Sequence, residues 1–253
     1  MDQRLTATIL RFDSLPSTNT EAARQAMRGA PEGVCVTARA QTAGRGRQDR
    51  RWFSPPDAGL YFSIILRPRF EARRWSLITL MAAIAVHDAL LEACALPTDI
   101  KWPNDIEAQG RKLCGILAET VDAPGGRAVI VGIGINLKDS AFPPDLSERA
   151  ASIEGVTGRA PDAEAVLGAL IKALSARYAA LHAADGAEQT RRAWIDRSSY
   201  AAGKRVRVTL DRRVISGTTR GLESDGALRV ETDQGTIEIV RAGEVNALRK
   251  DEA

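Results

Sequence analysis

Residues 41–48 are the segment with the most evident chemistry. They read Gln-Thr-Ala-Gly-Arg-Gly-Arg-Gln, and two more arginines follow at Arg50 and Arg51. No carboxylate occurs between positions 33 and 48. Glycine lets a backbone approach a ligand closely, and arginine offers a planar fork of donors that suits phosphate or carboxylate. The segment therefore predicts a mobile cationic loop that folds over an anion, although in isolation a solvated basic turn explains it better.

Three further segments carry polar residues or glycines at suggestive positions. They read Lys-Trp-Pro-Asn-Asp at 101–105, Arg-Lys-Leu-Cys-Gly-Ile-Leu-Ala-Glu at 111–119 and Val-Gly-Ile-Gly-Ile-Asn-Leu at 131–137. The third is not a dinucleotide fingerprint, because Leu137 stands where the third glycine belongs. Each segment alone has an ordinary structural explanation: a turn, a strand end or a close approach of two backbones.

Taken in order and spacing, these segments resemble the biotin–protein ligases. The resemblance starts at Ser-Thr-Asn (17–19) and continues through the basic loop (residues 41–51) to Trp52. It includes all three later motifs. It covers essentially the whole chain. It implies an α+β fold: a catalytic domain (1–199) with a mixed β-sheet flanked by helices, related to lipoate ligases and class II aminoacyl-tRNA synthetases, and a C-terminal SH3-like β-barrel (200–253). Because Ser-Thr-Asn begins at residue 17, we expect the short type, without a DNA-binding winged helix.

The resemblance also implies a mechanism with two half-reactions. The carboxylate of biotin attacks the α-phosphate of ATP, with Mg²⁺ on the phosphates, and a lysine of a biotin carboxyl carrier protein then attacks biotinyl-5′-adenylate. Arg45, Arg47 and Lys112 match the anion-binding positions of the family, as this charged chemistry requires. Lys112 is expected to bridge the carboxylate and the α-phosphate. Asp105 is expected to orient the acceptor lysine or take its proton.

The other candidate residues divide between the two ligands. The expected biotin-binding residues are Ser17, Thr18, Asn19, Gln41, Gly44, Arg45, Lys112 and Gly115. The expected adenylate-binding residues are Arg45, Gly46, Arg47, Trp52, Asn104, Lys112 and Asn136. Hydroxyls and amides suit the ureido ring of biotin, and the strands at 113–117 and 133–135 can line an apolar slot. One of residues 17–19 is also expected to cap a helix.

Two positions depart from the family pattern. Asp49 stands where another glycine is usual, so we expect a stiffer loop in which Asp49 pairs with Arg50 or Arg51. Cys114 replaces a smaller residue in a packed strand.

Periodicity and turn residues give the expected elements. Strands are predicted at 5–12, 34–38, 59–66, 112–120 and 128–137, with another ending at 100–102; helices at 21–27, 75–95, 163–182 and 189–197; and short β-strands at 206–210, 218–222, 228–232 and 236–240. A hairpin turn is predicted at 122–126. The four short strands indicate a small all-β barrel.

Composition excludes several other classes. A net charge of +3 over 253 residues is too small to indicate nucleic acid. Cys35, Cys94 and Cys114 are odd in number and lie among apolar residues, which favours a reduced cytoplasmic protein. No CxxC pair occurs and there are two histidines, so no metal site is expected. The apolar run 77–86 is too short to span a membrane.

Two alternatives stay open at this point. A lipoate or octanoate ligase would use the same chemistry on another acid. A nucleic-acid-binding module would use the basic loop and the small barrel. The acceptor carrier protein and the choice between monomer and homodimer are not determined by the residues.

Overall fold

The computed structural model describes residues 5–139, 142–210 and 213–247. The larger sheet is built from β1 (Thr8–Leu15), β2 (Val34–Gln41), β3 (Gly59–Leu66), β4 (Asp99–Lys101), β5 (Asp105–Ala108), β6 (Arg111–Ala123) and β7 (Gly126–Asn136). The helices are α1 (Thr18–Met27), η1 (Ala72–Arg74), α2 (Ser76–Cys94), α3 (Pro144–Ser147), α4 (Ile153–Thr157), α5 (Ala163–Leu181) and α6 (Gly186–Ile195). The smaller sheet contains β8 (Ala202–Thr209), β9 (Val214–Leu222), β10 (Leu228–Thr232), β11 (Ile237–Val240) and β12 (Glu244–Ala247).

The larger sheet is mixed, as the sequence predicted. Its strand order is β1-β2-β3-β7-β6-β5-β4. Strands β1 and β2 run parallel, and every other neighbouring pair is antiparallel. The central hairpin β6–β7 pairs Cys114 with Ile135 and Gly115 with Gly134. This register places the Gly-Ile-Gly-Ile-Asn motif beside the Lys-Leu-Cys-Gly motif.

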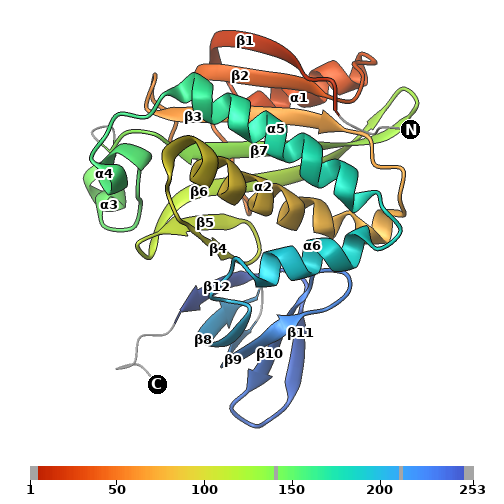
Figure 1. Ribbon diagram of the computed structural model, residues 1–253, viewed down its shortest axis with the longest axis vertical. Helices are drawn as coiled ribbons and strands as arrows, with labels where there is room; N and C mark the ends of the chain where they lie inside the picture. The colour runs from red at the N-terminus through yellow and green to blue at the C-terminus, as the bar shows by residue number, and fades with distance from the viewer. Residues whose placement is uncertain (1–4, 140–141, 211–212, 248–253) are drawn as a thin grey trace.

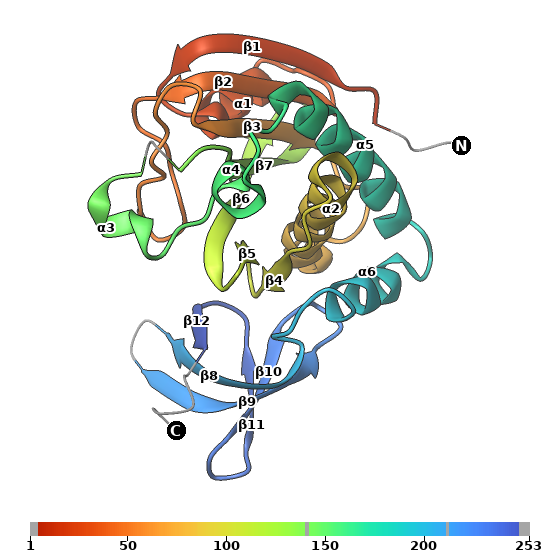
Figure 2. The ribbon, with the colours of Figure 1, turned by 60° about the vertical axis from the view of Figure 1, so that its left-hand side comes forward.

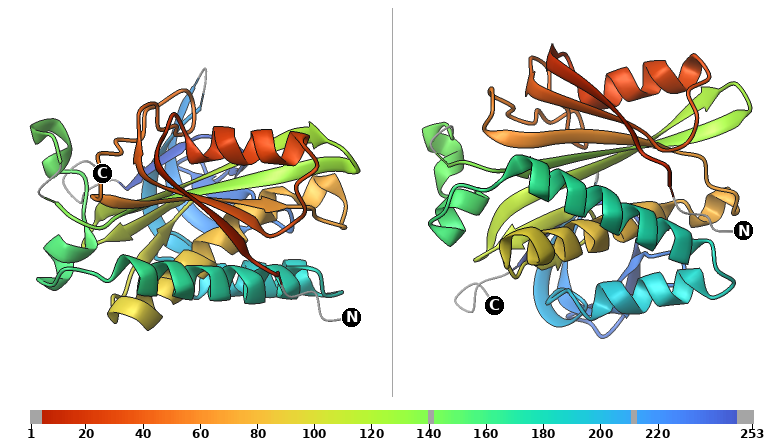
Figure 3. Two further views of the ribbon diagram at one scale, coloured as in Figure 1. Left: turned by 90° about the horizontal axis from the view of Figure 1, so that it is seen from above. Right: turned by 45° about the horizontal axis from the view of Figure 1, so that its top comes forward.

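Helices cover both faces of this sheet. Helix α1 packs on one face through Ala22 and Ala26, which meet Val36 and Ile130 in a small apolar cluster. Helices α2 and α5 pack together on the other face, where the main core lies. The two layers are visible on opposite sides of the sheet in the right panel of Figure 3.

The smaller sheet is antiparallel and docks on the larger part of the protein (Figures 1 and 2). Its strand order is β11-β10-β9-β8-β12. The predicted barrel is not observed, because within the described residues the edge strands β11 and β12 do not pair with each other. The strand β12 lies beyond the last strand that the sequence predicted.

The contact between the two sheets is well packed. Trp102 donates its indole N–H to the Gly226 carbonyl at 3.0 Å, and the Ser76 hydroxyl donates to the Asp225 carbonyl at 2.6 Å. Gly226 has φ +83° and lies so close to α2 that a Cβ would come within 2.8 Å of Leu80. Val245 of β12 belongs to the same apolar cluster as α2. The smaller sheet is therefore fixed relative to the larger one.

Helix α2 differs from the expectation about membranes. Together with η1 it spans Ala72–Cys94, and by length and composition it is long and apolar enough to cross a membrane. It is the one helix of the described residues that meets this test. Most of it is buried between the sheet, α5 and α6, as in the core helix of a soluble protein.

Candidate active site

A cleft of about 770 Å³ opens on the α1 face of the larger sheet, between the basic loop and the smaller sheet. All but one of the predicted site residues line it: Ser17, Thr18, Asn19, Gln41, Arg45, Gly46, Arg47, Trp52, Asn104, Asp105, Lys112, Gly115 and Asn136. The exception, Gly44, is buried next to the cleft, where a Cβ would come within 2.4 Å of the Trp52 carbonyl. The structure thus brings together residues that are spread over 120 positions.

Glycines form the floor of the cleft. Gly132 and Gly134 are two residues apart on β7 and so share a face. A Cβ on Gly132 would come within 2.1 Å of the Asn19 amide oxygen, and one on Gly134 within 2.5 Å of the Trp52 indole. Gly115, opposite Gly134, also contacts this indole. The glycines of the motif at 131–137 therefore leave the space that the side chains of Asn19 and Trp52 occupy.

The expected apolar slot is only partly present. Ile116, Leu117 and Ile133 line the cleft. Leu113 and Ile135, which the sequence also assigned to it, do not line the cleft and are fully buried in the core. Ile116 and Ile133 belong to the same buried core cluster. Since Ile133 and Ile135 alternate with Gly132, Gly134 and Asn136 along β7, their side chains lie on the other face of the sheet.

One end of the cleft carries a neutral polar network. The Gln41 amide oxygen accepts from the Thr18 backbone N–H at 2.9 Å and from the Thr18 hydroxyl at 3.2 Å. The buried Ser63 hydroxyl lies 2.8 Å from the Thr18 hydroxyl and 2.7 Å from the Asn19 amide oxygen. Ser63 has no place in any of the motifs, so its role could not be found from sequence.

This network corrects the expected helix cap. Ser17 has the extended backbone of an N-cap residue, but its side chain makes no capping hydrogen bond. Gln41, from another strand, satisfies the first free N–H of α1. The Ser17 side chain, nearly buried at the cleft wall, is therefore not committed to the helix.

An ion pair connects the neutral end to the basic loop. Arg45 donates to Glu119, and the other oxygen of Glu119 accepts from the Asn19 amide at 2.9 Å. Asn19 also donates to the Leu117 carbonyl at 3.2 Å. Glu119 is the last residue of the motif at 111–119, but nothing in that motif identifies Arg45 as its partner.

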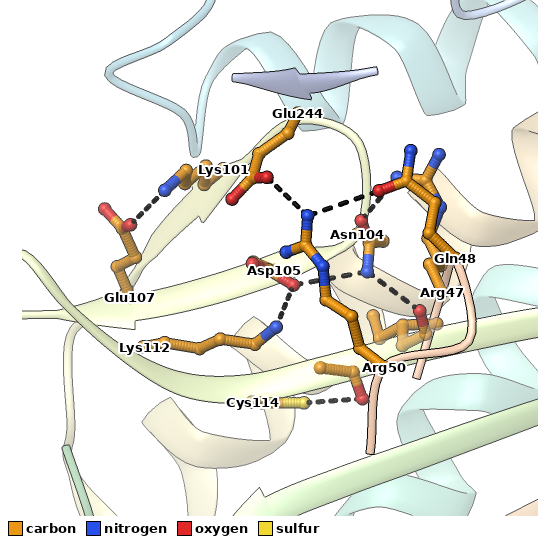
Figure 4. Close-up of polar contacts among 12 residues, drawn as sticks. Arg47, Gln48, Arg50, Lys101, Asn104, Asp105, Glu107, Lys112, Cys114 and Glu244 are labelled. Carbon is orange, nitrogen blue, oxygen red and sulfur yellow. Dashed lines mark hydrogen bonds and ion pairs between the residues drawn. The ribbon is translucent and has the colours of Figure 1, made fainter. Parts of the chain in front are cut away.

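The other end of the cleft is charged (Figure 4). Lys112 Nζ lies 2.8 Å from Asp105 Oδ1, and Asn104 donates to the same oxygen at 3.2 Å. Arg47 donates to the Asn104 amide oxygen at 2.8 Å. Burial lowers the pKa of Arg47, and the charge of Asp105 opposes this effect. An arginine remains charged at neutral pH, so Arg47 and Lys112 form a dense positive site around one carboxylate.

Asn136 supports the backbone of this charged end of the cleft. Its amide donates to the Ala151 carbonyl at 2.9 Å and to the Lys112 carbonyl at 3.4 Å. The residue is almost fully buried. In this arrangement its N–H groups hold the backbone of Lys112.

Trp52 lies between the two ends. Its ring packs on Gly115 and Gly134, and Lys112 Nζ lies 5.4 Å from the ring centroid, within cation–π distance. Its indole N–H is buried and has no hydrogen-bond partner among the described residues. Buried N–H groups are usually satisfied, so this donor is a candidate contact for a ligand.

The tip of the basic loop is a closed turn. Gly46 N–H donates to the Arg50 carbonyl at 2.7 Å, and Arg50 N–H donates to the Arg47 carbonyl at 3.2 Å. Gln48 and Asp49 have φ values of +55° and +57°. This left-handed region favours glycine, and aspartate tolerates it better than most residues. Asp49 therefore occupies a backbone conformation that a glycine would adopt without strain.

The expected pairing of Asp49 is wrong. Arg50 pairs with Glu244 of β12 and lies 3.2 Å from the Gln48 amide oxygen. Arg51 donates to the Thr42 carbonyl at 3.4 Å.

A second buried charge pair closes the cleft on the side of the smaller sheet. Lys101 Nζ lies 3.0 Å from Glu107 Oε1, and the Tyr200 hydroxyl donates to Glu107 Oε2 at 3.0 Å. All three residues line the cleft. Glu107 and Tyr200 were missed in the sequence because they lie outside the motifs.

The cysteines offer no nucleophile. Cys35 and Cys114 are buried, and burial raises the pKa of both thiols, that of Cys35 to about 12. Cys94, expected to be buried, is half-exposed and distant from the cleft lining. Thiolate chemistry at neutral pH is therefore excluded for Cys35 and Cys114.

Comparisons with known proteins agree with this geometry. The model of the biotin/lipoate A/B protein ligase family matches residues 11–136, and that of the biotin protein ligase C-terminal domain matches residues 202–246. The biotin–[acetyl-CoA-carboxylase] ligase of Paracoccus denitrificans is 36% identical over 90% of this chain and 96% of its own length. The bifunctional ligase/repressor BirA of Bacillus subtilis is 36% identical over 92% of this chain and 72% of its own length.

A solved structure shows the same fold. The biotin protein ligase of Aquifex aeolicus in complex with biotin and ATP aligns with a TM-score of 0.83 and 30% identity, over 96% of this chain and 99% of its own. The fold and the cleft define an enzyme of the biotin/lipoate ligase class. Within that class, this chain belongs to the biotin–protein ligases.

Proposed function

We propose that this chain activates biotin with ATP and transfers it to a lysine of a biotin carboxyl carrier protein. The observation that carries this proposal is the polarity of the cleft described above. A neutral network around Thr18 and Gln41 lies at one end, and the cations Arg47 and Lys112 lie at the other. Biotin has the same polarity, with a neutral ureido ring at one end and a carboxylate at the other.

The first step joins a carboxylate to a phosphate. A carboxylate oxygen attacks the α-phosphorus, the bond to the β-phosphate oxygen breaks, and pyrophosphate leaves. We propose that Lys112, which pairs with Asp105, neutralises both anions as they approach. Arg45 and Arg47 supply further positive charge from the loop. Such preorganised donors stabilise charge that develops in the transition state.

The second step releases AMP. The neutral amine of the acceptor lysine attacks the acyl carbon of the mixed anhydride, and the acyl–phosphate bond breaks. Asp105 accepts hydrogen bonds from Asn104 and Lys112, so its carboxylate is fixed at the charged end. We propose that it orients the incoming amine or takes its proton. A closed loop above the cleft would keep water from the anhydride.

Mg²⁺ is proposed to arrive with ATP. Among the described residues there is no group of three or more His, Cys, Asp or Glu that could hold a metal. Three of the four carboxylates that line the cleft, Asp105, Glu107 and Glu244, are each paired with a cation. Mg²⁺ commonly binds substrate phosphates and water with few protein ligands, so the residues fit a metal carried by the nucleotide.

The finer architecture and context also remain proposals. We propose that residues 200–253 form an SH3-like module and that the larger part, residues 1–199, is related to class II aminoacyl-tRNA synthetases. We further propose a cytoplasmic enzyme without specific DNA binding. A sequence-specific footprint at physiological salt would contradict the last point. Sedimentation distinguishes a monomer from a homodimer.

ATP–pyrophosphate exchange with biotin and with lipoate, measured in parallel, tests the proposal. Lipoate has an apolar dithiolane ring in place of the ureido group, so it would leave the Thr18–Gln41 network without partners. Sites built to hydrogen-bond a substrate reject analogues that lack those groups, by ~10⁴-fold in strong cases. Exchange with biotin and little with lipoate is expected; equal rates would overturn the assignment.

A further inference from the structure

The ion pair between Arg50 and Glu244 is outside the chemistry described above. It joins the tip of the basic loop to β12, 194 positions away in the chain. Figure 4 shows Glu244 reaching from β12 toward Arg50, which also contacts Gln48. The contact therefore links the smaller sheet to the loop that covers the cleft.

Glu244 is the fixed half of this contact. The smaller sheet is anchored to α2 and Trp102 through its Asp225–Gly226 turn. Strand β12 pairs with β8, with Glu244 opposite Thr209. Gly243, immediately before it, has φ +147° and lies where a Cβ would come within 2.9 Å of Leu210. The backbone on both sides of Glu244 is thus held in place.

Arg50 is the half that carries the loop. Its carbonyl accepts from Gly46 N–H and its own N–H donates to the Arg47 carbonyl, so one turn holds residues 46–50 together. Whatever fixes Arg50 therefore fixes the backbone of Arg47. Arg47 in turn reaches the charged end of the cleft at Asn104.

We propose that Glu244 is a positioning residue: it holds Arg50, and through the turn it holds Arg47 over the phosphate of the adenylate. The smaller sheet would then contribute to retention of the intermediate without touching it. This inference rests on the proposed function. It assigns to Glu244 the role of a latch for the closed loop.

The expected effect is modest, because both side chains are partly exposed, Arg50 by 57% and Glu244 by 35%. Exposed ion pairs contribute about 0.2–1 kcal/mol, which corresponds to a factor of roughly 1.4 to 5 in an equilibrium constant. We therefore expect biotinyl-adenylate to dissociate about two to five times faster from Glu244→Gln. The affinity for biotin alone should change less than the retention of the adenylate, because biotin lacks the phosphate over which Arg47 is held.

Four variants, Glu244→Gln, Glu244→Asp, Arg50→Gln and the double change, separate the effect of the contact from that of general charge. Glu244→Asp keeps the negative charge near Lys101 and Arg149 but is one methylene shorter. If the contact matters, Glu244→Asp should release the adenylate as fast as Glu244→Gln; if only the local field matters, it should behave as wild type and the proposal fails. Arg50→Gln combined with Glu244→Gln should be no worse than either single change, because both remove the same interaction.

A matched control comes from the same sheet. Asp233→Asn breaks the Arg205–Asp233 ion pair, which has similar exposure (36% and 58%) and lies away from the cleft. It should leave adenylate release unchanged. If Glu244→Gln also leaves it unchanged, or if the effects of Arg50→Gln and Glu244→Gln multiply, the latch does not exist. Absence of pyrophosphate exchange in the wild type would instead refute the proposed function, so the two failures are distinguishable.

Discussion

Replacing Gly134 by alanine tests the architecture of the cleft with one methyl group. The added Cβ would lie 2.5 Å from Cε2 and Nε1 of Trp52, whereas ordinary contact begins at 3.4 Å. The strand cannot yield, because Gly134 is paired with Tyr61 on one side and Gly115 on the other. The indole must therefore shift by about 1 Å or no longer pack on residue 134.

The size of the effect follows from that displacement. Trp52 is followed by Phe53 and Ser54 at the base of the loop. The backbone N–H of Trp52 donates to the Gly44 carbonyl at 2.9 Å. A shift of the indole therefore moves the loop that carries the arginines. Misplacing catalytic groups by 1 Å can lower a rate by ~10²-fold, so we expect adenylation to slow by about that factor. Overpacking costs about 1–3 kcal/mol of stability.

Initial rates of biotin-dependent pyrophosphate exchange provide the assay, with urea unfolding in parallel. Gly168→Ala is the matched control: it adds the same methyl group on α5, with nothing within 4 Å of the new Cβ. It should leave exchange unchanged and, in a helix interior, stabilise the fold by up to about 1 kcal/mol. Near-normal exchange by a folded Gly134→Ala protein would refute the view that Trp52 must pack directly on residue 134.

Three further predictions concern charge. Lys112→Ala should slow adenylation by ~10²-fold or more, which is the scale for loss of one preorganised donor, and the protein should still fold. Single-turnover formation of the adenylate measures this effect. Lys172→Ala, which removes an exposed partner of Glu92, is the control. Arg47→Gly should speed adenylate release and increase labelling of a bystander protein, and should weaken adenylate retention more than it weakens binding of biotin alone, as measured by dissociation, biotin-affinity and labelling assays. Burial lowers the pKa of His87, so the unfolded chain binds a proton that the folded chain does not. The free energy of unfolding should therefore fall as the pH drops below about 6.5, and His87→Gln should flatten that part of the curve.

The sequence predicted the strands and long helices well where hydrophobic patterning dominates. The aromatic and β-branched run at Gly59–Leu66 is a strand with those same ends, and α2 and α5 lie within a residue of expectation. Strand β5 was missed because Asp105 was assigned to a turn, although it begins a strand paired with β6. Strand β12 was missed because four residues with two exposed positions carry almost no periodic signal.

The grouping of the motif residues around one cleft was predictable, but their contacts were not. Motif residues could be assigned to one ligand site because their combination is specific, and the structure places them around one cleft. Their partners were not predictable. Ser63 satisfies Thr18 and Asn19 from a strand without polar neighbours, and Glu244 meets Arg50 across most of the chain. Such contacts depend on strand register and domain docking, which a single sequence does not encode locally.

The cations of the cleft have different reasons to bind a phosphate. Arg45 already pairs with Glu119, and Lys112 with Asp105, so an incoming anion must compete with a carboxylate for each. Arg47 contacts a neutral amide, that of Asn104, and it is partly removed from water. Replacing a neutral partner by a phosphate gains more than exchanging one anion for another, since charge-assisted hydrogen bonds are roughly twice as strong as neutral ones. Arg47 should therefore distinguish the adenylate from biotin most sharply. The paired cations Arg45 and Lys112 would instead limit the affinity for anions that reach only part of the cleft.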